Sequence, residues 1–194
     1  MPIREFCIAL FAAFALACAV PVHAQSTYGI GRAAAPAEIA GWNIDVDRYG
    51  NNLPPGSGTV VHGHDVFDQQ CAACHGAKGE GGVGDQLVGG QGTLTTQKPV
   101  RTVGSYWPYA PTLFDYIRRA MPQNAPQSLS NDDVYAVSAY ILNLNGLIPA
   151  DATLDAETLS AVKMPNSGMF VSDPRPDVKN SACMTGCLST GGLR

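Results

Sequence analysis

The chain has 194 residues, a formal net charge of −4 at pH 7 and only 14% charged residues, alongside 21 glycines and 14 prolines. It carries no basic block, which argues against nucleic acid as a partner, and its length suits one ordinary domain with extensions rather than two independent cores. The abundance of glycine and proline predicts that loops make up much of the protein.

Residues 1–24 have the three-part layout of a secretory signal peptide, because Arg4 is followed by an apolar run over 11–20 and by Val22-His23-Ala24. The run is shorter than the roughly 20 residues that span a bilayer, which disfavours a retained membrane helix. A lipoprotein anchored at Cys18 is disfavoured because the residues before it match a lipobox poorly. We predict cleavage near Ala24 and no transmembrane segment in the mature chain.

The first predicted element of the mature chain is an extended N-terminal arm over residues 25–57. Glycine, proline and asparagine recur through it at short intervals, and only residues 33–40 have a helical pattern. We expect this arm to be irregular and to lack a core of its own.

A helical pattern follows from residue 59 to residue 75, with Val60, Phe67 and Cys71 on one face. Residues 76–105 are rich in glycine and show little periodicity. A loop of this length in a compact domain usually serves a function rather than a mere connection.

Two further helices are predicted. The second covers residues 110–120, with Pro111 in its first turn. The third follows a capping-box pattern that starts at Ser130, and it ends at Asn145-Gly146. Residues 58–148 are therefore assigned to a small all-α domain.

The first helix ends in the motif Cys71-Ala72-Ala73-Cys74-His75. Two thiols three residues apart share a helix face and can each add to a vinyl group on one porphyrin edge, while the next histidine reaches the iron. A thioredoxin-like pair would follow a strand, a structural disulfide would leave His75 unused, and a zinc site would want a fourth ligand from a chain with few histidines. The motif predicts one covalent haem c, attached at Cys71 and Cys74 with His75 as an iron ligand.

The second axial ligand must come from elsewhere, and Met121 is the best candidate. It lies between the second and third predicted helices and is followed by Pro122, so it can approach the opposite face of the haem. A methionine more often fills a core, and Met164 in the C-terminal extension is the rival ligand. His62 and His64 are too close to the start of the haem helix to reach that face, and we predict that they are surface residues.

Ligation by histidine and methionine fills both axial positions and raises the reduction potential of the iron. It favours outer-sphere electron transfer over binding of oxygen or peroxide, so we predict an electron carrier without catalytic residues of its own. Two alternatives stay open. One is a free-standing carrier or a subunit of another dehydrogenase, and the other is a haem sensor or peroxidase with a labile sixth ligand.

An aromatic cluster, Tyr106-Trp107-Pro108-Tyr109, precedes the second helix. Trp107 and Tyr109 have polar tips that can donate hydrogen bonds to haem propionates, and Arg101 or Arg118 could neutralise the propionate charge. The alternative is an aromatic lid packed on the core.

The C-terminal extension covers residues 149–194 and is predicted to be irregular, apart from a short helix near 155–162. Cys183 and Cys187 have the wrong spacing for a second haem motif and no following histidine. A local disulfide is the favoured interpretation of this pair, with free or intermolecular thiols as the alternative.

Several segments resemble the cytochrome subunit of sulfane and sulfite dehydrogenases of bacterial sulfur oxidation. They are GWNIDV at 41–46, LPPGSG at 53–58, TVGSYWPYA at 102–110 and FDYIRRAMP at 114–122. The resemblance covers roughly residues 28–148, with a weaker similarity around 163–166.

The resemblance implies a class I cytochrome c fold with long irregular arms, and a periplasmic heterocomplex. In it, a molybdenum-cofactor partner oxidises a sulfur compound and this subunit relays the electrons to a soluble cytochrome c. It also implies Met121 as axial ligand and the arm over 28–57 as a strap across the partner. Some members carry a second haem domain, whereas this chain has one haem motif, so the choice between sulfane and sulfite oxidation stays open.

Overall fold

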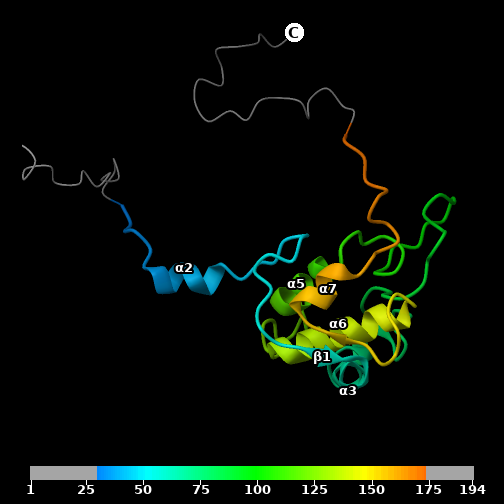
Figure 1. Ribbon diagram of the computed structural model, residues 1–194, viewed down its shortest axis with the longest axis horizontal. Coiled ribbons are helices and arrows are strands. Elements are labelled where there is room, and N and C mark those ends of the chain that lie inside the picture. The colour runs from blue at the N-terminus through cyan, green and yellow to red at the C-terminus, as the bar shows by residue number, and fades with distance from the viewer. Residues whose placement is uncertain (1–29, 174–194) are drawn as a thin grey trace, which may run out of the picture. The chain divides into compact units, whose positions relative to one another are not determined.

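The computed structural model describes residues 30–173, so the predicted signal peptide and the Cys183/Cys187 pair lie outside the described part (Figure 1). The chain divides into two units, up to Trp42 and from Asn43 onward, which are described separately. No helix among the described residues is long and apolar enough to cross a membrane. The elements in order are α2 (Pro36–Trp42), β1 (Gly58–Thr59), α3 (Val60–Gln70), α4 (Ala72–His75), α5 (Ala110–Ala120), α6 (Asn131–Leu144), β2 (Thr153–Leu154) and α7 (Ala156–Ala161).

In the first unit, α2 is a short helix with no buried residue. Its first turn is held by Glu38, whose carboxylate accepts a hydrogen bond from the Ala35 amide at 2.7 Å and pairs with Arg32. Ile39 and Trp42 are both exposed, Trp42 by 88%. The helix is therefore formed by local contacts, while its large apolar side chains stay uncovered.

In the second unit, the core forms where α3 lies against α6 (Figure 1). Gly63 permits the close approach, because a Cβ atom there would lie 2.9 Å from Cβ of Tyr140 and would also collide with the Ala136 carbonyl. Phe67 is 1% exposed and packs on the Tyr140 ring. Burying a side chain of this size stabilises the fold by about 1.5–3 kcal/mol, so this crossing anchors the domain.

The structure confirms the predicted all-α class and the second and third helices. Pro111 lies in the first turn of α5, and the Ser130 side chain caps α6 by accepting the Asp133 amide at 3.1 Å. The predicted first helix is interrupted, since Cys71 leaves helical geometry at φ −121° and separates α3 from α4. The amides of Cys74 and His75 both donate to the Cys71 carbonyl and restart the helix.

Residues 43–57, placed in the N-terminal arm by their sequence pattern, belong to the second unit and pack onto its core. The buried Val46 donates its amide to Asp115 at 2.8 Å, and Arg118 donates to the Ile44 carbonyl at 2.9 Å. Two charged side chains of α5 therefore hold this stretch against the core through its backbone, which a hydrophobic pattern does not report.

Part of the C-terminal extension also joins the core. Strand β2 pairs antiparallel with β1, with Gly58 opposite Leu154. The predicted short helix is confirmed as α7, which begins with a capping box at Asp155 and buries Leu159. Both strands are only two residues long, which is too short for a periodic signal.

Candidate haem site

His75 ends α4, and its ring is oriented by one backbone contact. Its Nδ1 atom lies 2.7 Å from the carbonyl oxygen of Asp85. A carbonyl oxygen only accepts hydrogen bonds, so Nδ1 carries a proton, and the tautomer that can bind a metal has its lone pair at Nε2. Metal-bound histidines are fixed in the same way, by a donor bond from the nitrogen that faces away from the metal. The geometry fits His75 as an iron ligand.

The Asp85 carbonyl belongs to residues 84–91, which we call the proximal loop. The Gly84 amide donates to the Cys74 carbonyl at 2.8 Å, which brings the loop alongside the histidine. A Cβ atom on Gly84 would lie 2.9 Å from Cε1 of His75. Only glycine lets the backbone pass this close to the imidazole without displacing it.

The two cysteines of the motif are free thiols, with Cys71 half-buried and Cys74 exposed. Burial, and secondarily the neighbouring Cys74, raises the pKa of the Cys71 thiol to about 11. Cys71 also packs against the hydrophobic core. Cys71 lies against apolar side chains and Cys74 is exposed to solvent. This pair of environments suits the attachment of a flat, largely apolar ring that is partly buried. The residues present therefore fit haem c.

Met121 follows α5 directly and is half-buried, and it packs against the same hydrophobic core as Cys71 and Trp107. Met164, the rival ligand, is only 3% exposed and is a member of that core. Its burial is explained by packing alone. Met121 therefore remains the better candidate for the second axial ligand.

The aromatic cluster is divided between packing and the surface. Trp107 is half-buried with its ring edge against Tyr116 at 5.9 Å between centroids, while Tyr109 precedes α5 and lies beneath the Arg48 guanidinium. Of the two arginines considered for the propionates, Arg118 donates to the Ile44 carbonyl and Arg101 lies over the Tyr106 ring. Propionate contact by Trp107 and Tyr109 stays a prediction.

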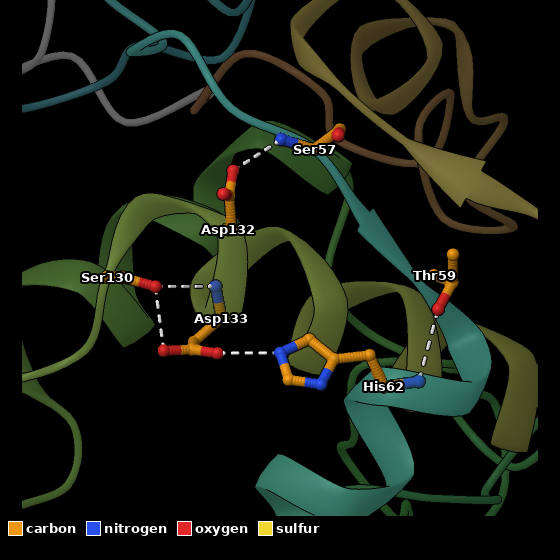
Figure 2. A network of polar contacts seen from close by, with 6 residues as sticks. All are labelled: Ser57, Thr59, His62, Ser130, Asp132 and Asp133. Carbon is orange, nitrogen blue, oxygen red and sulfur yellow. Dashed lines mark hydrogen bonds and ion pairs between the residues drawn. The ribbon is translucent and has the colours of Figure 1, made fainter.

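His62 is exposed, as predicted, and belongs to a polar network between α3 and α6 (Figure 2). Its Nε2 atom lies 2.7 Å from a carboxylate oxygen of Asp133, whose other oxygen accepts from Ser130. The Ser130 hydrogen bond, helped by His62, lowers the pKa of Asp133. His64 is likewise exposed and packs its ring edge on Tyr140. Both histidines have structural partners that account for them without a metal.

The sequence pattern indicated a function for the long loop over 76–105, but it did not place the proximal loop in the haem site. The partner of His75 is a backbone carbonyl, which every residue carries, so the identity of Asp85 gave no signal. The dense glycines before it were the available hint, because close backbone approach requires them.

The profile of the cytochrome c family matches residues 60–145, which include the haem motif and Met121. Among solved structures, the chain is similar to the sulfane dehydrogenase SoxCD from Paracoccus pantotrophus. The two chains are 42% identical, the match covers 86% of this chain and 84% of that one, and the TM-score is 0.72. The chain belongs to the family of c-type cytochrome subunits of sulfane and sulfite dehydrogenases. A search of curated proteins gave no significant match.

As a member of this family, this chain carries covalently bound haem c and functions in electron transfer during sulfur oxidation. The fold of the chain is that of cytochrome c. Membership in this family favours an exported protein.

Proposed function

We propose that this chain is the periplasmic, single-haem relay of a sulfur-compound dehydrogenase. It receives electrons from a molybdenum-cofactor subunit that oxidises the sulfur compound, and it passes them to a soluble cytochrome c. The observation that carries the proposal is the orientation of His75, whose Nε2 is left free by the 2.7 Å bond to Asp85. The similarity to a dehydrogenase component over most of the chain supports the kind of partner.

Haem c, when bound, supplies a one-electron couple that needs no change in its ligands. Cys71 and Cys74 would attach the haem through thioether bonds, and His75 and Met121 would coordinate its iron, which would leave no coordination site for a substrate. The chain's own residues fix His75 through the Asp85 carbonyl and exclude water with the apolar core. The exposed Cys74 would keep its attachment point near the surface.

Trp107 and Tyr109 are proposed to face the propionate edge of the ring. Both are half-buried and both flank the start of α5. An indole or phenol that donates to a propionate orients it and holds the carboxylate at the edge of the core. This role is secondary to ligation, for which His75 and Met121 are proposed.

The segment from residue 30 to residue 42 is proposed to contact the dehydrogenase subunit. Its helix α2 is held by its own ion pair and buries nothing, and Ile39 and Trp42 are exposed. A preformed helix loses less conformational entropy on binding than a disordered segment. Residues 43–57 are different, because they already pack on the cytochrome core.

The proposal is tested by mixing oxidised holoprotein with the molybdenum subunit and a sulfane-sulfur substrate in a stopped-flow instrument. The ferrous α-band should appear within the turnover time of the dehydrogenase and should fade when oxidised soluble cytochrome c is added. A holoprotein that dithionite reduces but the dehydrogenase does not would refute the relay. It would instead favour a free-standing carrier or a subunit of another dehydrogenase.

A further inference from the structure

The proximal loop is held in place by a residue that lies more than fifty positions away. Asn145, which ends α6, is 7% exposed and contacts the loop with both ends of its side-chain amide. The Gly89 amide donates to its Oδ1 at 3.0 Å, and its Nδ2 donates to the Leu87 carbonyl at 3.2 Å. The two anchored residues are two and four positions from Asp85, whose carbonyl holds His75.

The side chain of Asn145 is itself fixed. Its Nδ2 atom also donates to the Ile141 carbonyl at 2.9 Å, one turn back in α6. The backbone carbonyl of Asn145 accepts a hydrogen bond at 3.2 Å from the side-chain amide of Gln91, which lies at the far end of the loop. The loop is thus clamped to the end of a helix whose other face forms the α3–α6 crossing.

A carboxamide is the chemically suitable side chain for this place. It offers a donor and an acceptor at adjacent atoms, whereas an ionised aspartate only accepts and an aliphatic side chain does neither. The neighbouring Thr102 is buried as well, at 2% exposure, and its hydroxyl donates to the Gly89 carbonyl. Buried polar networks of this kind are costly when one member is removed.

We propose that Asn145 is a positioning residue for the proximal haem ligand. By fixing Leu87 and Gly89, it keeps the Asp85 carbonyl within hydrogen-bond distance of the His75 Nδ1–H. This inference rests on His75 ligating the iron, as proposed above.

The bond at Nδ1 has an electronic consequence. A well-formed bond from Nδ1–H to a carbonyl makes the imidazole a better electron donor to the metal. A better donor stabilises ferric relative to ferrous iron and lowers the reduction potential. Loosening the Asp85 contact should therefore raise the potential.

The test uses holoprotein with Asn145→Ala and, as a matched control, Asn143→Ala. Asn143 lies on the same last turn of α6, but its amide donates to the Ile148 carbonyl rather than to the proximal loop. Proton NMR of the ferrous protein follows solvent exchange of the His75 Nδ1–H. Asn145→Ala should speed that exchange about tenfold, which corresponds to ~1.4 kcal/mol, and should raise the reduction potential. Asn143→Ala should change neither.

Thr102→Val is the second variant, because it removes one bond to Gly89 with little change in volume and serves if Asn145→Ala fails to fold. It should give a smaller change of the same sign in both measurements. Unchanged exchange and potential in the folded Asn145 variant, or in Thr102→Val, would overturn the proposal. A wild-type protein without a histidine-ligand signal would instead refute the ligation on which it rests.

Discussion

The two sides of the proposed haem site are built differently. The proximal loop is bound by residues outside it, including Val103 and, more than fifty positions away, Asn145. The methionine segment, residues 121–129, is not: among the described residues, its hydrogen bonds join positions at most four residues apart. Residues 123–128 are exposed. The proposed proximal ligand, His75, is therefore fixed by the fold, whereas Met121 is held by packing and, if it is the second ligand as proposed, by its bond to iron in the holoprotein.

We expect this difference to make the proposed site combine a rigid ligand with a more readily replaced one. A segment with exposed backbone bonds and few buried contacts opens at low cost. Met121 should therefore detach before His75 when the protein is stressed by heat or denaturant.

The largest expected effect comes from Met121→Ala. Without its thioether the sixth position opens, so the red methionine–iron charge-transfer band should disappear, the reduction potential should fall and carbon monoxide should bind the ferrous protein. Visible spectroscopy with and without carbon monoxide measures this. Met164→Leu is the matched control, because this volume-conserving change in the core costs less than about 1.5 kcal/mol and should leave the band intact. The opposite pattern would make Met164 the ligand.

A moderate effect is expected for Gly84→Ala on the proximal side. The new Cβ would lie 2.9 Å from the imidazole, and overpacking of this kind costs about 1–3 kcal/mol. Thermal unfolding of the holoprotein should show the loss, together with a shifted reduction potential. Gly168→Ala meets nothing within 4 Å and should behave like wild type. Equal stability of the two variants would mean that the backbone at Gly84 does not lie in close contact with the His75 ring.

The smallest effect is expected for Asp133→Asn, which weakens a brace that touches neither ligand (Figure 2). The folded-state pKa of Asp133 is lowered from its ordinary 3.8, so its contribution is present at neutral pH and is lost as pH falls through that lowered value. A partly exposed pair contributes below about 1 kcal/mol. The variant should be slightly less stable than wild type at pH 7 and equal to it at strongly acidic pH. A stability gap that widens in acid would contradict this sign.

Helices α5, α6 and α7 were predictable because their caps and apolar spacings are local signals. The packing of residues 43–57 was not, since the hydrogen bond that joins Val46 to Asp115 uses the backbone amide of Val46. The break at Cys71 was missed because a continuous apolar face hides a single residue outside helical geometry.

The site divides in the same way. The side-chain chemistry and the order of residues in the sequence identify four candidates directly, namely Cys71, Cys74, His75 and Met121. Asp85 acts through its carbonyl and Gly84 through the absence of a side chain. Asn145 acts through contacts that only the folded chain creates. These three roles are invisible in a single sequence.

The central claim is that both axial positions are filled, so that the chain carries electrons rather than binding a gas or a substrate. Carbon monoxide added to ferrous wild-type holoprotein at neutral pH tests it most directly. We predict an unchanged ferrous spectrum, with the methionine–iron band present in the ferric form. A ferrous carbon monoxide spectrum would show an open position and would contradict the relay in favour of a haem sensor or peroxidase.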